Sequence, residues 1–356
     1  MKIAETVGNL GCLVTIIGRR SGDCCSNTSI PFPVKRFSMF FKSGFLFYAF
    51  FNVRLFFFLM FHRFDLLVSN DLDTLLPNFL VSKFKKLPLV YDSHEYFTGV
   101  PEIQNRPIVK WIWKRIEKSI FPRLKYVMTV SDSIAELYET EYAIRPQTVR
   151  NCSRKTEQIL PFSRKELEID NDHLLLILQG TGINIDRGGI ELIDAVKCTD
   201  NVSLLIVGSG DQYGKLVEKT TELGLTGKIK FIPKVPWNTM IRYTKSADVG
   251  LSLDKNSNLN YLYSLPNKLF DYLSAGIPVI ATELPELSKI LNKYKCGILI
   301  SEPTVEEISN AIKELRDNRN LLTEMKKYSS IASESVNWEN ESLKVEAFYK
   351  PIINKL

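Results

Sequence analysis

The chain has 356 residues, 45% hydrophobic and 24% charged, which is enough for two globular domains and excludes a disordered, collagen-like or coiled-coil protein. Lys and Arg (46) exceed Asp and Glu (40) by a net charge of +6, too little to indicate nucleic acid but suited to phosphorylated ligands or an anionic membrane. Six cysteines without CxxC spacing and three histidines argue against a zinc site and for reduced thiols in a cytoplasmic protein. We interpret the adjacent Cys24 and Cys25 as loop residues.

The N-terminal half shows short apolar strands separated by helices. An amphipathic helix is expected at residues 3–10, where no signal-peptide pattern is seen. Short apolar strands that alternate with helices predict a parallel sheet buried on both faces. Strands are expected at 13–17, 66–69, 89–91 and 126–130, with helices at 74–83 and 107–121.

Residues 37–61, FSMFFKSGFLFYAFFNVRLFFFLMF, form an unusually aromatic segment. Only 11 residues separate Lys42 from Arg54, and seven more precede His62, whereas a membrane-spanning helix needs about 20 uninterrupted apolar residues. Two interpretations remain open: a helix packed on a sheet, or a helix that lies in the surface of an anionic membrane.

A polar stretch at 150–172 is interpreted as a linker, after which a second series of strands and helices begins. We therefore predict two doubly wound α/β domains, residues 1–155 and 156–338, with residues 339–356 packing back on the first domain. Ligands of such sheets bind at the carboxyl ends of the strands, so we expect a cleft between the two halves. The second series has strands at 174–178, 203–207, 229–232, 249–253, 279–281 and 297–300, and helices at 189–197, 212–223, 238–245, 268–274, 286–293, 305–317, 320–333 and 339–350.

The segment 263–282, YSLPNKLFDYLSAGIPVIAT, contains the strongest motif. Pro266 and Asn267 lead into a helix that starts near Lys268, and the free N–H groups of a helix start can bind an anion. Asp271 lies one turn beyond Asn267 and should face the same pocket. The alternative is an ordinary capped helix.

Two glycine-rich turns follow strands of the second half. Residues 178–189, LQGTGINIDRGG, place Arg187 before a helix, where it could clamp a diphosphate or simply be solvated. Residues 207–211, VGSGD, resemble a dinucleotide fingerprint, but Gly214 follows Gly210 by four residues and not three, so we do not predict NAD binding.

Polar residues also end two strands of the first half. Residues 92–95 read DSHE, and we expect His94 and Glu95 at the cleft, although a single histidine can also be structural. Asn70, Asp71 and Asp73 end the preceding strand and should line the same rim.

Over nearly its whole length the chain resembles glycosyltransferase family 4, the retaining group 1 transferases of GT-B fold. The resemblance rests on the motifs in this order: DSHE, the Gly/Arg turn, VGSG and PNKLFDYLSAGIPVI. The subgroup most similar to it assembles bacterial surface polysaccharides and glycoconjugates. The resemblance implies a hexosyltransferase with a UDP- or GDP-linked sugar as donor, a glycan or lipid-linked acceptor, and no metal or other cofactor. It also implies a cytoplasmic protein, peripheral at the inner membrane face through residues 37–61, with no nucleic-acid partner.

By motif position, Arg187 matches the basic residue at the diphosphate, and Asp271 matches the second glutamate of the family's pair, which binds ribose. Asn267 and Lys268 would lie at the phosphates or base, and His94 near the transferred sugar. The catalytic candidates are therefore His94, Arg187 and Lys268. The donor-binding candidates are Gly180, Thr181, Arg187, Gly208, Gly210, Tyr263, Ser264, Pro266, Asn267, Lys268 and Asp271, and the acceptor-side candidates are Asn70, Asp71, Asp73, His94 and Glu95.

The sequence also departs from the family pattern. Tyr263 replaces the first glutamate of the pair, Thr181 replaces a frequent arginine, and the first strand expected of the N-terminal domain is missing. Two alternative functions therefore stay open. One is a non-catalytic protein that binds nucleotide sugar or scaffolds an assembly complex, and the other is a UDP-sugar epimerase of the same fold.

Overall fold

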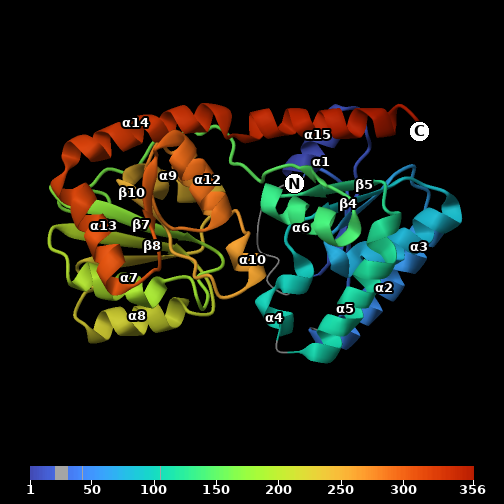
Figure 1. The fold of residues 1–356 in the computed structure, drawn as a ribbon, viewed down its shortest axis with the longest axis horizontal. Helices are drawn as coiled ribbons and strands as arrows, with labels where there is room; N and C mark the ends of the chain where they lie inside the picture. The colour runs from blue at the N-terminus through green and yellow to red at the C-terminus, as the bar shows by residue number, and fades with distance from the viewer. Residues whose placement is uncertain (21–30, 42, 105) are drawn as a thin grey trace. The chain divides into compact units, whose positions relative to one another are not determined.

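The computed structural model describes residues 1–20, 31–41, 43–104 and 106–356, and its contacts divide the chain into two compact units (Figure 1). Unit 1 comprises Met1–Arg150 and Ser342–Leu356, and unit 2 comprises Asn151–Glu341. The predicted loop residues Cys24 and Cys25 lie outside the described residues.

Unit 1 contains a four-stranded parallel sheet in the order β3-β4-β5-β6. All five residues of β4 are buried, as expected for an inner strand covered on both faces. The elements are α1 (Lys2–Asn9), β1 (Ile16–Arg19), β2 (Val34–Phe37), α2 (Gly44–Phe61), β3 (Leu67–Asn70), α3 (Leu75–Lys85), β4 (Leu89–Ser93), α4 (Pro101–Gln104), α5 (Pro107–Ile120), β5 (Tyr126–Thr129), α6 (Asp132–Tyr142) and β6 (Gln147–Thr148), with 3-10 turns at Leu72–Thr74, Phe97–Gly99 and Phe121–Arg123.

The start of unit 1 differs from the prediction. The strand expected at 13–17 forms at Ile16–Arg19 and pairs in parallel with β2, a strand the sequence did not indicate, in a separate two-stranded sheet. The helix expected from residue 37 begins only at Gly44. Phe37 instead ends β2, where its buried ring packs against Phe51 and Phe58 at centroid distances of 6.0 and 5.6 Å.

Helix α2 packs one face against the protein and exposes the other. Phe47, Phe51, Leu55 and Leu59, spaced by four residues, are its buried positions, and the helix contacts α3. Among the described residues, α2 is the helix long and apolar enough to cross a membrane, with 18 residues, a mean hydropathy of 1.8 and 22% of them buried. The line of buried residues shows that α2 is packed on protein along one side and presents apolar side chains on the other.

Unit 2 is a six-stranded parallel sheet in the order β12-β11-β10-β7-β8-β9 (Figure 1). Alternate residues of β7 face opposite sides: Leu175 and Ile177 join one apolar cluster, and Leu174 and Leu176 join the other. The predicted doubly wound order is confirmed, and α10 is an element that the sequence did not indicate. The elements are β7 (Leu174–Gly180), α7 (Gly189–Lys197), β8 (Val202–Gly208), α8 (Tyr213–Glu222), β9 (Ile229–Pro233), α9 (Trp237–Ser246), β10 (Val249–Ser252), α10 (Leu259–Leu262), α11 (Asn267–Ser274), β11 (Val279–Thr282), α12 (Pro285–Tyr294), β12 (Gly297–Ile300), α13 (Val305–Asp317) and α14 (Arg319–Ser335). The last helix, α15 (Trp338–Ile353), begins in unit 2 and belongs to unit 1 from Ser342 onward.

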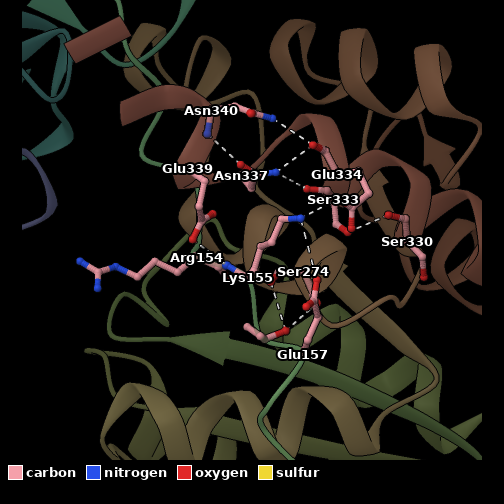
Figure 2. Close-up of polar contacts among 11 residues, drawn as sticks. Arg154, Lys155, Glu157, Ser274, Ser330, Ser333, Glu334, Asn337, Glu339 and Asn340 are labelled. Carbon is pink, nitrogen blue, oxygen red and sulfur yellow. Dashed lines mark hydrogen bonds and ion pairs between the residues drawn. The ribbon is translucent and has the colours of Figure 1, made fainter. Parts of the chain in front are cut away.

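The segment that opens unit 2 is tied to the α14–α15 junction by polar contacts, which Figure 2 shows. Lys155 Nζ pairs with Glu334 at 2.7 Å, and the Ser274 hydroxyl donates to the Arg154 carbonyl at 2.9 Å. At the junction, Asn337 Oδ1 accepts the N–H of Asn340 at 2.9 Å, which caps the start of α15. The segment is therefore anchored although residues 149–173 contain no helix or strand.

Candidate functional site

The two glycine-rich turns of unit 2 lie side by side because they follow neighbouring strands. Gly180 at the end of β7 is in register with Gly208 at the end of β8, and the Ser209 N–H donates to the Gly180 carbonyl at 3.0 Å. A Cβ at residue 208 would lie 1.8 Å from that carbonyl oxygen, so only glycine fits. Gly210 is packed similarly against the Ile183 backbone, and Thr181 is exposed. The packing of the backbone therefore explains why glycine occupies these positions, whether or not a ligand binds.

The predicted motif at 263–271 surrounds the start of α11. Pro266 is the N-cap residue, and Asn267 opens the helix with an exposed side chain. Tyr263 is half-buried at the end of α10, and the Ser264 hydroxyl donates to the Tyr261 carbonyl at 3.0 Å. The structure thus places this helix start at the carboxyl ends of the parallel strands, where such folds bind ligands.

A buried carboxylate that the sequence analysis did not single out joins the two predicted cations. Asp254, fully buried after β10, pairs with Arg187 Nη1 at 3.0 Å and with Lys268 Nζ at 3.4 Å. The Arg187 guanidinium also lies over the Tyr261 ring, 4.6 Å from its centroid. Asp254 could have been found by the rule that identified Asp71, because both lie within two residues of the end of a strand. Tyr261 had no such signal.

Asp271 is more deeply buried than Asn267 and Lys268 on the same helix. It is 5% exposed, and its oxygens accept hydrogen bonds from Gln179 Nε2 at 3.0 Å, from Trp237 Nε1 at 3.1 Å and from the Ser153 hydroxyl. None of these three donors was among the predicted site residues. The carboxylate thus holds the end of β7 and the start of α9 in position.

In unit 1, the predicted acceptor-side residues gather at the ends of β3 and β4, which are neighbours in the sheet. Asp71, at φ 57°, accepts the His94 N–H through Oδ1 at 2.8 Å, and His94 Nε2 lies 3.1 Å from Asp92 Oδ2. Asn70 is exposed at the end of β3, and Asp73 is the middle residue of the 3-10 turn that follows. Asp92 belongs to the DSHE string but had not been given a role.

The charges of this group follow from their contacts. The hydrogen bond that His94 donates to Asp92, together with the Asp92 charge, outweighs burial and raises the pKa of His94 to about 9, so the imidazole is protonated at neutral pH. Burial raises the pKa of Asp71, and burial together with the Asp71 charge raises that of Asp73 to about 6. The site therefore offers a cationic donor at His94. Glu95 is half-buried, and its carbonyl accepts the Ser93 hydroxyl at 2.9 Å.

Behind His94 lies a polar network that sequence reasoning missed. Glu117 is fully buried on α5 and accepts Lys114 Nζ at 3.1 Å and the Tyr142 hydroxyl at 2.8 Å. Lys114 also pairs with Glu141, which accepts the Tyr96 hydroxyl at 2.9 Å. Burial raises the pKa of Glu117 despite the nearby Lys114. This network anchors the chain two residues after His94.

Within the described residues, no group of three or more His, Cys, Asp and Glu side chains is arranged to hold a metal ion. The charged groups of unit 2 instead form the Arg187–Asp254–Lys268 cluster, in which two cations share one carboxylate.

Two family models cover most of the chain. The model described as Glycosyltransferase Family 4 matches residues 1–151, and the model described as Glycosyl transferases group 1 matches residues 163–331. The chain belongs to glycosyltransferase family 4. The predicted family is therefore confirmed, and the second match contains the whole cluster of Arg187, Asp254 and Lys268.

Curated relatives are distant. The chain is 24% identical over 243 residues to a chitobiosyldiphosphodolichol beta-mannosyltransferase of Candida albicans, covering 62% of this chain and 52% of that protein. It is 25% identical over 193 residues to the lipopolysaccharide core biosynthesis glycosyltransferase LpsD of Rhizobium meliloti, covering 54% and 53%. The chain thus spans about half the length of these two relatives.

Solved structures show the same fold at low identity. Sucrose-phosphate synthase of Thermosynechococcus elongatus superposes with a TM-score of 0.78 at 16% identity, covering 100% of this chain and 92% of that one. WaaG, a glycosyltransferase of lipopolysaccharide biosynthesis, gives 0.75 at 18% identity, covering 98% and 94%. Anabaena HepE in complex with UDP gives 0.70 at 15%, covering 90% and 86%. The predicted GT-B α/β fold is confirmed.

Proposed function

We propose that this family member is a retaining hexosyltransferase that moves a sugar from a UDP- or GDP-linked donor to a hydroxyl of a glycan or lipid-linked acceptor, in the assembly of a surface polysaccharide or glycoconjugate. The observation that carries the proposal is the pair of cations, Arg187 and Lys268, held on one buried carboxylate beside the start of α11. A diphosphate leaving group needs fixed positive charge where its own charge develops, and preorganised cations supply it.

Five of the predicted residues are assigned a role in this reaction. Arg187 and Lys268 stabilise the leaving diphosphate, and Asn267 lies beside them at the helix start. Asp271 is assigned to the ribose side, together with the Trp237 indole that it holds. His94, protonated at neutral pH, donates to the sugar or the acceptor. The proposal assigns the diphosphate charge to these side chains and uses no metal or other cofactor.

The comparisons support this choice of donor and acceptor. HepE, which shares the fold, has been solved with UDP, with UDP and glucose, and with UDP-glucose. The names of the LpsD and WaaG relatives place those proteins in lipopolysaccharide biosynthesis. A polymeric or lipid-linked glycan acceptor is therefore the class that we propose for this chain.

The test is turnover of UDP- and GDP-linked sugars by the wild type, by Arg187→Ala and by Arg316→Ala. Arg316 lies on α13 and pairs with its neighbour Asp317, so it serves as the control. We expect Arg187→Ala to lower kcat/KM by about 100-fold or more, with Arg316→Ala unchanged. Equal kcat/KM for the wild type and both variants would contradict the role of Arg187 in binding the diphosphate.

The same assay separates the alternatives. A non-catalytic protein would bind a nucleotide sugar without turnover. Tyr263 and Thr181 favour this alternative, because each replaces a charged residue of the family pattern. An epimerase would change the sugar of the nucleotide sugar without transferring it. Identification of the product by mass spectrometry and NMR distinguishes transfer from epimerisation.

We also propose that the protein is cytoplasmic and peripheral to an anionic membrane face, through residues 37–61. Phe45, Phe57 and Phe61 are 61%, 52% and 80% exposed on α2. Residues 31–64 contain several Lys and Arg but no Asp or Glu, so the charge of this segment complements anionic lipid. An 18-residue helix with one buried face and one aromatic face suits an interfacial position.

Sedimentation with vesicles tests this placement. We expect binding to phosphatidylglycerol vesicles at low salt, weaker binding to phosphatidylcholine, and loss of binding in the variant Phe57→Ser/Phe61→Ser. Leu343→Ser is the control, because Leu343 is equally exposed, at 61%, but lies on α15. A wild type that stays in the supernatant with anionic vesicles at low salt would refute the membrane contact.

A further inference from the structure

The segment after β10 holds the Arg187 turn in place. The Lys255 N–H donates to the Asp186 carbonyl at 2.8 Å, and Lys255 Nζ pairs with Glu191 at 2.5 Å. Gly188 packs so closely on Leu253 that a Cβ at residue 188 would lie 2.5 Å from the Leu253 Cβ. The turn before α7 and the end of β10 are therefore one rigid unit of structure.

Asp254 extends this connection to a third element. Its two oxygens reach Arg187 on the turn and Lys268 on α11, at 3.0 and 3.4 Å. The carboxylate is 0% exposed, whereas the side chains of Arg187 and Lys268 keep 25% and 10% of their surface exposed. The two cations thus have a side accessible to a ligand, and the carboxylate lies behind them.

One hydrogen-bond donor of the Arg187–Asp254–Lys268 cluster has no partner within the part of the chain that the structure describes. Arg187 Nε is buried and has no hydrogen-bond partner among the described residues. The guanidinium uses one edge for Asp254 and one face for the Tyr261 ring. A buried polar atom without a partner is costly unless a ligand satisfies it, which points to an anion in this place.

We propose that Asp254 is the positioning residue of the donor site: it orients Arg187 and Lys268 together so that both face the diphosphate. The inference rests on the proposed function, since it deepens the account of that same site. Asp254 itself does not touch the donor. It acts through the two cations, because a carboxylate facing the diphosphate would repel it.

Asp254 has a second effect, on the protonation of Lys268. Burial lowers the pKa of Lys268, the attraction of Asp254 opposes this, and the positive charge of Arg187 lowers it further. Two further titratable groups lie beside the cluster: Tyr261, whose ring lies under the Arg187 guanidinium, and Tyr272, which is affected by the Asp254 charge. Replacing Asp254 by Asn removes the one opposing contribution, so Lys268 should lose its proton at a lower pH than in the wild type.

A matched control lies at the opposite end of the same strand. Asp248, directly before β10, also bridges two cations, Arg164 and Lys326. It additionally accepts the Leu175 N–H at 2.9 Å. Asp248→Asn therefore removes a similar carboxylate from the amino end of the sheet, far from the strand ends where ligands bind.

The experiment measures pyrophosphate, UDP and GDP affinity by calorimetry for wild type, Asp254→Asn, Asp248→Asn and Asp254→Asn/Lys268→Arg, from about pH 6 to 9. At the acidic end Asp254→Asn should already bind more weakly than wild type, because the two cations are charged but no longer held together by one carboxylate. The loss should grow toward the alkaline end, by about tenfold, because Lys268 releases its proton at a lower pH than in the wild type. In the double variant the introduced guanidinium stays charged and should abolish this pH dependence. Asp248→Asn should match wild type throughout.

The outcomes separate the inference from the function beneath it. Wild-type affinity of Asp254→Asn across the pH range overturns the positioning role, even if turnover is normal, and an affinity ratio that is reduced but does not vary with pH overturns the effect on Lys268 protonation. A wild type that binds neither pyrophosphate nor UDP nor GDP overturns the proposed donor site and this inference with it. If Asp254→Asn does not fold, Asp254→Glu, which keeps the charge, should retain the wild-type pH dependence with weaker binding, and a shifted dependence overturns the proposal.

Discussion

Gly188 gives the sharpest test of the packing at the donor site, because the chain contains a matched glycine elsewhere. Gly188 and Gly224 both have φ of +68°, a conformation in which an L side chain costs about 1–2 kcal/mol. At Gly224 a Cβ would meet nothing within 4 Å, whereas at Gly188 it would lie 2.5 Å from the Leu253 Cβ and 2.7 Å from the Leu253 carbonyl oxygen. Alanine at residue 188 must therefore displace backbone, which adds about 1–3 kcal/mol.

The expected loss of stability is then about 1–2 kcal/mol for Gly224→Ala and about 2–5 kcal/mol for Gly188→Ala. In a domain of this size each kcal/mol lowers the Tm by about 2–4 °C, which circular dichroism resolves. Any gain from a less flexible unfolded chain is the same in both variants and cancels. Gly188→Ala should also weaken pyrophosphate binding, because Arg187 precedes it. Equal shifts in Tm for the two variants would refute the close packing on Leu253.

Two further predictions concern unit 1. Asp92→Asn should lower the pKa of His94 from about 9, as measured by NMR titration, and a pKa that stays near 9 would show that Asp92 is not the cause. In the wild type we expect stability to fall as pH rises from about 6.5 through 9, because the folded protein holds a proton on His94 that the unfolded chain releases. Asp92→Asn should remove this loss of stability. Lys114→Met should destabilise the protein by about 3 kcal/mol in urea unfolding, because it leaves the buried Glu117 carboxylate without its ammonium partner. Lys118→Met, exposed on the same helix, should cost little, and similar losses for both would contradict the network.

The parallel sheets were predictable because their signal is local. The run 174–178 is apolar throughout and Gly180 follows two residues later, which indicates a strand buried on both faces, and the structure adds only residues 179 and 180 to it. The segment 37–61 has no such signal. Its phenylalanines have no clear period, so the sequence could not show that Phe37 ends a strand and that the helix starts only after Ser43.

For the site as well, the sequence predicted some features and not others. Spacing indicated that Asp271 faces the same side as Asn267, four residues earlier. One turn of helix also carries it several ångströms deeper into unit 2, where Gln179 and Trp237 reach its oxygens and Asn267 remains exposed. Periodicity predicts the face of a helix but not the depth at which each turn lies, since depth depends on segments distant in the sequence.

The two bridged carboxylates of β10 show why function needs the direction of the strand as well as its charges. Asp248 and Asp254 flank the same four-residue strand, and each holds two cations, so ion pairing does not distinguish them. Only Asp254 lies at the carboxyl end, where the glycine turns and the start of α11 converge. There a cation can serve a ligand as well as its carboxylate, whereas at the amino end the same arrangement can only stabilise the fold. Asp248→Asn should therefore lower the Tm and leave donor affinity intact, and a loss of affinity equal to that of Asp254→Asn would show that the direction of the strand does not decide the role.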